Sequence, residues 1–283
     1  MMKGLVMEGG AMRGLFTAGV TDVLMEAGVD FDGAIGVSAG ACFGCNYKSK
    51  QIGRSIRYNL AFCDDPEYVS FRSLFKTGEL FNEDFAYNKI PNEYDLFDYE
   101  TYKENPMDFY VVCTDLETGK AVYKKVNVLH EENFKWLKAS ASMPLAAKMV
   151  EVGGRKLLDG GVSDSIPLRF FIHKGYDKNI VILTQPPHFV KKKNQLAPVM
   201  KKVYKEYPEF VKAVYDRHNV YNKTLKYVRY MEKQGKCIVL QPDEKLPIGR
   251  VEHDPDNVLK AYMVGRKVGK ENLERVKKYL GDK

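Results

Sequence analysis

The stretch Ala34-Ile35-Gly36-Val37-Ser38-Ala39-Gly40 places a serine between a short apolar run and a series of small residues. The apolar run is typical of a buried strand, and the sequence after Ser38 predicts a helix. A serine at such a sharp strand-to-helix turn projects its hydroxyl above the sheet edge, and Gly36 and Gly40 avoid the crowding that Cβ atoms would cause. The helix would also direct N–H groups towards a developing oxyanion. The pattern therefore predicts that Ser38 is a nucleophile.

Outward from this turn, the chain alternates predicted strands and helices, which favours a parallel sheet covered by helices on both faces. The region Cys63–Tyr102 is polar and aromatic and predicts no clear element. Strands are expected at Gly4–Met7, Ala34–Val37, Asp108–Cys113, Ala121–Val126, Met149–Val152, Arg155–Leu158, Ile180–Leu183 and Cys237–Leu240, and helices at Gly14–Ala27, Asn133–Ser142 and Val258–Tyr279. This alternation is typical of an α/β fold.

The motif Asp159-Gly160-Gly161 follows a hairpin predicted around Gly153-Gly154. An aspartate at the end of a strand, followed by two glycines, can stand at an open rim of a sheet, although Asp-Gly pairs also form ordinary turns. A serine hydroxyl needs a base within hydrogen-bonding reach, and an aspartate can supply it. Because the ordinary aspartate pKa is about 4, the pair predicts a buried, partly dry site that raises the pKa of Asp159.

The loop Gly9-Gly10-Ala11-Met12-Arg13-Gly14 connects the first predicted strand to the first predicted helix and allows two interpretations. One is a degraded dinucleotide-binding loop, but its acidic partners, Asp30 or Asp32, precede the next strand instead of ending it. The other is an oxyanion hole built from bare N–H groups at a helix N-terminus. Adjacent parallel strands would bring this loop and Ser38 to the same carboxyl edge of the sheet, which favours the oxyanion hole.

Together these motifs resemble those of the patatin-like phospholipase family, which places a glycine-rich oxyanion loop, a G-x-S-x-G nucleophile and a D-G-[G/A] base in this order. Ala139-Ser140-Ala141-Ser142-Met143-Pro144 is also similar to the family's A-S-x-x-x-P segment, and the resemblance extends from about Gly4 to Pro167. It implies a three-layer sandwich with a mainly parallel central sheet flanked by helices. Ala11 departs from the family's third glycine: it keeps the N–H donor but would be strained at a positive φ.

The resemblance implies a serine acyl hydrolase that acts on a lipid or other acyl-ester substrate with no metal or cofactor. Ser38 would attack the ester carbonyl, Asp159 would take its proton, and water would hydrolyse the acyl-enzyme. The N–H groups of Gly10, Ala11 and Met12 would hold the oxyanion, with Gly9, Arg13 and Gly14 completing the loop, and Gly160 and Gly161 would complete the base motif. The alternative is an inactive protein of the same fold that binds a lipid surface or serves as a scaffold.

An α/β-hydrolase would also use a G-x-S-x-G motif, followed along the chain by an aspartate and a histidine. Of the late histidines, His173, His188, His218 and His253, the last fits this order best. However, one strand, one loop and one helix precede Ser38, whereas that fold builds several strands before its nucleophile. The Ser38–Asp159 dyad is therefore the preferred interpretation.

The 283 residues carry a formal net charge of +7, and 45% of them are hydrophobic, which excludes disordered and low-complexity proteins. The segment Lys191–Lys236 holds thirteen Lys and Arg against four Asp and Glu, so the basic character belongs to this segment. Its apolar residues follow a helical spacing: Phe210, Val214, Tyr221, Leu225 and Val228. This spacing predicts an amphipathic helix packed on the core, and the alternative is an interfacial helix that contacts an anionic membrane. Nucleic acid is not expected as a partner, because no known binding module frames these residues.

We expect residues 1–190 to form a catalytic domain and residues 191–283 a mostly helical extension packed on it. No apolar run is long enough for a secretory signal or a transmembrane helix. Five sparsely placed cysteines do not indicate a disulfide framework, and Cys42-Phe43-Gly44-Cys45 predicts inert thiols rather than a redox or zinc site. The expectation is a cytoplasmic protein, with peripheral membrane association if the basic segment binds lipid. The sequence does not predict an oligomeric state.

Overall fold

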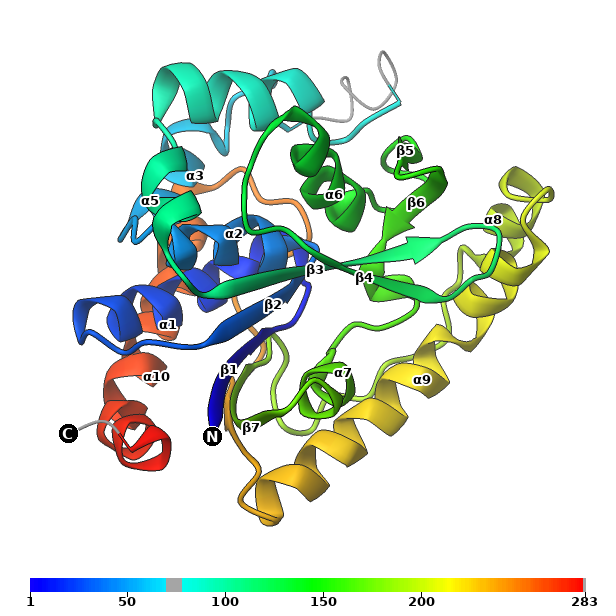
Figure 1. Ribbon diagram of the computed structural model, residues 1–283. Helices are drawn as coiled ribbons and strands as arrows, with labels where there is room; N and C mark the ends of the chain where they lie inside the picture. The colour runs from blue at the N-terminus through cyan, green and yellow to red at the C-terminus, as the bar shows by residue number, and fades with distance from the viewer. Residues whose placement is uncertain (70–77, 282–283) are drawn as a thin grey trace.

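A sheet of mainly parallel strands forms the centre of the computed structural model, which describes residues 1–69 and 78–281 (Figure 1). Within these residues the sheet has eight strands in the order β5-β6-β3-β2-β1-β7-β8, and β4 pairs with β3 outside this path. The pairs β1–β2, β2–β3, β1–β7 and β7–β8 are parallel, and the other pairs are antiparallel. The strands span Met2–Met7 (β1), Gly33–Val37 (β2), Asp108–Asp115 (β3), Ala121–Lys125 (β4), Val150–Val152 (β5), Arg155–Asp159 (β6), Tyr176–Ile182 (β7) and Cys237–Leu240 (β8).

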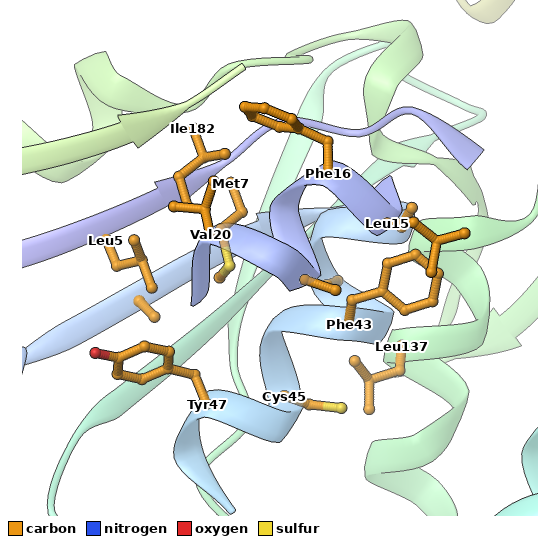
Figure 2. Packing of buried hydrophobic residues seen from close by; sticks show 14 of the residues in the cluster. Leu5, Met7, Leu15, Phe16, Val20, Phe43, Cys45, Tyr47, Leu137 and Ile182 are labelled. Atoms are coloured by element: carbon orange, nitrogen blue, oxygen red, sulfur yellow. The ribbon is translucent and has the colours of Figure 1, made fainter. Parts of the chain in front are cut away.

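Helices cover both faces of this sheet, which confirms the predicted three-layer sandwich. Successive residues of a strand point to opposite faces, so Leu5 and Met7 of β1 belong to one core cluster and Val6 to the other. Figure 2 shows part of the first cluster, where Phe16 and Phe43 come from two helices on the same face. The helices of this face are α1 (Gly14–Glu26), α2 (Ala39–Lys48), α3 (Arg54–Phe62), α6 (Glu131–Ala141) and α10 (Pro255–Leu280), and those of the opposite face are α7 (Leu168–His173) and α9 (Pro208–Lys233).

Strand β3 brings together the ends of two strands from distant parts of the sequence. Because β4 pairs along one edge of β3, β2 and β6 share the other edge. β2 runs parallel to β3 and ends with Val37 opposite Val112, whereas β6 runs antiparallel and ends with Asp159 opposite Cys113. Since Val112 and Cys113 are consecutive, the C-terminal ends of β2 and β6 meet at this point of the sheet.

The C-terminal part of the chain shares the core of the N-terminal part. β8 adjoins β7 in the central sheet, and buried residues of α10 belong to the same cluster as β1 and α1. Helix α10 lies directly on α1, where a Cβ at Gly19 or Gly265 would clash with the backbone of the other helix. The boundary near residue 190 stays a prediction.

The basic segment Lys191–Lys236 contains α8 (Ala197–Val203) and the long helix α9. The predicted amphipathic helix is confirmed, because the apolar stripe of α9 faces the core: Phe210, Val214, Tyr221 and Val228 are buried, and Leu225 is half-buried. Among the described residues, no helix is both long and apolar enough to cross a bilayer.

The remaining expected elements are confirmed with shifts at their ends. The largest shift is in β7, which begins at Tyr176 instead of Ile180 because the polar side chain of Asn179 is buried and donates to the Tyr176 carbonyl at 2.7 Å. The unassigned region Cys63–Tyr102 includes a π-helix at Phe85–Tyr94 and the start of α5 (Tyr99–Glu104), while residues 70–77 lie outside the described residues.

Candidate active site

Ser38 occupies the turn between β2 and α2 with a positive φ of 55° and a ψ of −124°. Such a backbone conformation costs a residue with a side chain about 1–3 kcal/mol, so the surrounding structure must enforce it. A Cβ at Gly40 would lie 2.5 Å from the Met7 carbonyl oxygen, and a Cβ at Gly36 would clash with the Gly40 carbonyl oxygen. The sharp turn predicted at Gly36–Gly40 is therefore confirmed, and its two glycines are sterically required.

Ser140 of α6 anchors this turn from the neighbouring helix. The Ser38 backbone N–H donates to the Ser140 hydroxyl at 2.9 Å, and that hydroxyl donates to the Val112 carbonyl at 2.6 Å. Ser140 is buried, so the strained turn is linked to β3 through a hydrogen-bonded path shielded from water. The sequence around Ser140 predicted no role for this side chain, because a serine between two alanines carries no local sign of a distant partner.

Asp159 ends β6 and lines the same cavity as Ser38, whose hydroxyl lies close enough to the Asp159 carboxylate to lower its pKa. The carboxylate also accepts from the Gly161 N–H at 2.7 Å, and the Asp159 N–H donates to the Ser142 carbonyl at 2.8 Å. A Cβ at Gly160 would clash with the backbone of β3. The structure thus brings together the two side chains that the motifs predicted. Gly160 leaves room for the backbone of β3, and Gly161 donates its N–H to the Asp159 carboxylate.

Burial raises the pKa of the Asp159 carboxyl above its usual value, in the direction predicted from the sequence. The positive charge of Arg217, the hydrogen bond from Ser38 and the N–H of Gly161 act in the opposite direction. The Arg217 Nε donates to the Gly161 carbonyl, which holds the guanidinium next to the carboxylate. A carboxylate with a raised pKa is a stronger base than an exposed one.

The loop Gly9–Gly14 lies against the nucleophile turn, since a Cβ at Gly9 would lie 2.9 Å from the Val37 carbonyl oxygen. Ala11 adopts a φ of 49°, which is the strain expected where an alanine replaces a glycine. Gly14 begins α1 and packs on α2, where a Cβ would lie 2.7 Å from the Ala39 Cβ.

Some backbone N–H groups of this loop already donate to carbonyl oxygens of the protein, and others have no acceptor among the described residues. The Met12 N–H donates to the Arg250 carbonyl at 3.4 Å, the Arg13 N–H to the Gly10 carbonyl at 3.2 Å, and the Gly14 N–H to the Ala11 carbonyl. The Met12 N–H is therefore engaged in this structure, and its expected part in an oxyanion hole stays a prediction. Within residues 1–69 and 78–281, the N–H groups of Gly9, Gly10 and Ala11 find no acceptor, so these three are the donors free to bind a developing oxyanion.

Ser38 stands at the junction of two cavities. The first has a volume of about 140 Å³ and lies on the side of α2, α3 and the π-helix. Much of its wall comes from the region that the sequence left unassigned, and its larger apolar and aromatic side chains are Phe43, Tyr58, Tyr68, Phe81, Tyr87, Ile90, Phe97 and Leu137. This apolar cavity suits a hydrocarbon chain.

The second cavity has a volume of about 110 Å³ and contains both Ser38 and Asp159 in its wall. Its other charged side chains are Glu8, Arg13, Lys191, Arg217 and Arg250. We call it the basic cavity. The two cavities share Ala11, Ser38 and Met143, so a group attached to Ser38 can reach into either one.

Two regions of the chain match models of known protein families. A family model described as patatin-like phospholipase matches residues 5–172, which is more than half of the chain. The chain belongs to the patatin-like phospholipase family. A second model, a domain of unknown function (DUF6363), matches residues 207–281, so the C-terminal helices have a family of their own outside the patatin-like region.

The patatin-like chain is also similar to individual proteins. It is 29% identical over 199 residues to the uncharacterised protein YjjU of Escherichia coli, covering 64% of this chain and 52% of YjjU. It is 26% identical over 187 residues to lysophospholipase NTE1 of Chaetomium globosum, covering 62% of this chain and 11% of NTE1. The chain therefore spans about half of the first relative and about a tenth of the second. The crystal structure of VipD from Legionella pneumophila aligns with a TM-score of 0.49 and 12% identity, over 97% of this chain and 67% of VipD.

In the part of the chain that the structure describes, no histidine lines either cavity at Ser38. His253, the best candidate for a triad, faces the Cys63 carbonyl at 2.9 Å through its Nδ1. Burial raises the pKa of Cys42 to about 11 and that of Cys45 to about 12, as expected for inert thiols. No group of three or more His, Cys, Asp or Glu placed to hold a metal ion occurs among the described residues.

The anchoring of the turn by Ser140 leads to a prediction on nucleophile reactivity. We expect Ser140→Ala to slow the labelling of Ser38 by a fluorophosphonate about tenfold or more, because the Ser38 N–H and the Val112 carbonyl lose their partner. Ser142→Ala is the matched control, since that hydroxyl follows α6 and donates to the Lys138 carbonyl of this helix; its labelling rate should stay within about twofold. Equal rates for Ser140→Ala and the wild type would contradict the anchoring role.

The position of Arg217 predicts how the acid side of the pH–rate profile responds to mutation. Activity needs ionised Asp159, so kcat/KM for a neutral ester should fall as the pH drops through the pKa of Asp159 in the free enzyme. Because Arg217 lowers that pKa, Arg217→Gln should move the fall to higher pH, and Arg217→Lys should move it less. If kcat/KM of Arg217→Gln falls at the same pH as in the wild type, or at a lower pH, Arg217 does not lower the pKa of Asp159.

Proposed function

We propose that this protein is a serine acyl hydrolase that cleaves lipid esters with a Ser38–Asp159 dyad through an acyl-enzyme. The observation that carries the proposal is the position of the Ser38–Asp159 pair, which lies between an apolar cavity and the free N–H groups of Gly9–Ala11. Family membership supports lipid ester hydrolysis as the activity. The NTE1 relatives are named lysophospholipases, which suggests a substrate with a single acyl chain.

In the first half of the reaction, Asp159 accepts the hydroxyl proton of Ser38 as Oγ attacks the ester carbonyl carbon. The carbonyl oxygen becomes an oxyanion, which the N–H groups of Gly9, Gly10 and Ala11 stabilise together with the N-terminal end of α2. The bond to the alcohol oxygen then breaks, and this oxygen takes the proton from Asp159 as it leaves. The product of this half is the alcohol and an ester of Ser38.

In the second half, Asp159 takes a proton from water, and the resulting hydroxide attacks the acyl carbon of the Ser38 ester. A second oxyanion forms in the same place, and its collapse returns the proton to Ser38 Oγ and releases the carboxylic acid. The acyl chain occupies the apolar cavity in both halves, and the leaving alcohol lies on the side of the basic cavity.

The surface around α8 offers a way to approach a lipid aggregate. Val190, Leu196, Val199 and Val203 are 66%, 52%, 49% and 57% exposed, and the basic side chains of Lys192, Lys193, Lys201 and Lys202 accompany them. We call these residues the α8 patch. Leu196 and Met200 also line the basic cavity, so the patch lies beside the opening to Ser38. Exposed apolar residues among lysines fit an anionic membrane surface, and we propose peripheral contact there.

The dyad is tested by substitution of its members. Ser38→Ala should abolish both fluorophosphonate labelling and hydrolysis of short-chain nitrophenyl esters, and Asp159→Asn should lower kcat/KM by about 10²–10⁴ because the general base is lost. His253→Gln is the control and should change kcat/KM by less than about twofold, because this ring faces Cys63 and not Ser38.

Three outcomes would contradict the proposal. Ester hydrolysis by Ser38→Ala at the wild-type rate would exclude Ser38 as the nucleophile. A large loss in His253→Gln would favour a histidine triad. A wild-type protein that is neither labelled nor active, yet binds lipid vesicles, would instead be an inactive lipid-binding or scaffold protein.

The membrane contact is tested by flotation with vesicles. Replacing Lys192, Lys193, Lys201 and Lys202 together by Gln should weaken binding to vesicles rich in phosphatidylglycerol by at least about tenfold, since each lysine near an anionic surface contributes about 1 kcal/mol. Lys260→Gln with Lys270→Gln on α10 is the control for loss of surface charge, because both residues are exposed and lie outside the patch. Equal binding of the wild type to phosphatidylcholine vesicles, or an equal effect of the α10 pair, would contradict the contact.

A further inference from the structure

The basic cavity holds more positive charge than the proposed chemistry needs. Arg13, Lys191, Arg217 and Arg250 line it together with two carboxylates, Glu8 and Asp159. Three of the four cations follow residue 172, where the match to the patatin-like model ends. The C-terminal part of the chain therefore contributes most of the positive charge next to Ser38.

In the described part of the chain, the charged ends of these four side chains lie outside salt-bridge distance of any carboxylate. The Nε of Arg13 is buried and has no acceptor among the described residues. Buried donors without acceptors are rare in folded proteins, and an ordered water or a bound anion is a usual partner for them.

The carboxylate of Glu8 offsets part of this positive charge, but neutral donors occupy both of its oxygens, so it pairs directly with none of the four cations. Tyr221 donates its hydroxyl to one oxygen at 2.5 Å, and Thr184 donates its backbone N–H to the other at 2.6 Å. Glu8 therefore links α9, through Tyr221, to the segment after β7, through Thr184, at the wall of the cavity. Asp159 is the base of the dyad.

Lys191 is held in position over this site. Its backbone N–H donates to the Asn222 side chain at 2.9 Å and its carbonyl accepts from the same side chain at 3.0 Å. Its ammonium group lies 4.1 Å from the centre of the Tyr221 ring. Burial lowers the pKa of Lys191 to about 7, with Arg217, Arg13 and Arg250 acting in the same direction and Glu8 opposing them. A bound anion would restore the charge of this lysine.

We propose that the basic cavity binds the phosphate of the substrate's leaving group, so that the preferred substrate is a lysophospholipid with a net negative headgroup. The inference rests on the proposed function and extends it. Because the two cavities meet at Ser38, an acyl chain in the apolar cavity directs the glycerol phosphate of the same molecule into the basic one. Arginine and lysine are the side chains that bind phosphate best, through charge-assisted hydrogen bonds.

The kinetic test compares two soluble substrates with the same acyl chain, octanoyl lysophosphatidylglycerol and monooctanoylglycerol. The wild type should favour the anionic substrate by about tenfold or more in kcat/KM, and Lys191→Met or Arg250→Gln should lower this ratio about tenfold. Lys223→Met removes a charge from the exposed surface of α9 and is the control; its ratio should equal that of the wild type.

The pH dependence of the same ratio gives a second readout. The phosphodiester stays negative, so the ratio should fall in the wild type as the pH rises through about 7 and Lys191 loses its proton. The titration of Asp159 changes kcat/KM for both substrates by the same factor, so it cancels in their ratio. Lys191→Arg keeps its charge at every working pH, can stack on Tyr221 in the same way, and should hold the ratio constant.

Binding separates this inference from the proposed function. In the Ser38→Ala background, octanoyl lysophosphatidylglycerol should bind about tenfold more tightly than after the added change Lys191→Met, whether or not the wild type is a hydrolase. Equal affinities, or a wild-type ratio that Lys191→Met leaves unchanged, would overturn the headgroup site and leave the hydrolase standing. Inorganic phosphate that binds as tightly as the lysophospholipid would assign the cavity to a free anion and would also overturn it.

Discussion

The shared edge of β3 is the constraint on which the site depends. β2 and β6 run towards each other along this edge, and their last residues pair with Val112 and Cys113, which are neighbours in the chain. Hydrogen bonds of the sheet therefore bring Ser38 and Asp159 together although they come from distant parts of the sequence. The same point of β3 receives the Ser140 hydroxyl, so one backbone position organises the nucleophile, the base and the helix that anchors them.

Two residues of the site have strained backbone conformations. Ser38 and Ala11 both adopt a positive φ, and close packing of Gly9, Gly36 and Gly40 holds the Ser38 turn in place. Burial of Asp159 makes its carboxylate a stronger base, while Arg217 and the Gly161 N–H limit the rise of its pKa. The residues after 172 complete this arrangement, because Arg217 holds the base motif, Arg250 accepts from Met12, and Tyr221 fixes Glu8.

Much of the fold and part of the site could be predicted from short-range sequence patterns. The apolar run before Ser38, the glycines of the turn and the hairpin before Asp159 each reflect requirements of neighbouring residues, so the α/β sandwich and the Ser38–Asp159 pair could be predicted. Ser140, Arg217 and Lys191 could not be assigned to the site, because their roles depend on contacts with residues far away in the sequence. The aromatic wall of the apolar cavity was missed for a related reason: Tyr68, Tyr87 and Phe97 lie in a region with a π-helix and no regular period. The hydrogen bond from the Met12 N–H to the Arg250 carbonyl could not be predicted either, because Arg250 lies near the other end of the chain.

A crystal structure of the protein after reaction with a fluorophosphonate that carries a short alkyl chain would test the site directly. We expect a bond from phosphorus to Ser38 Oγ, a phosphoryl oxygen within hydrogen-bonding distance of the N–H groups of Gly9–Ala11, and the alkyl chain in the apolar cavity beside Tyr58 and Tyr68. An adduct on another residue, or an alkyl chain lying among Arg13, Lys191 and Arg217, would contradict this expectation.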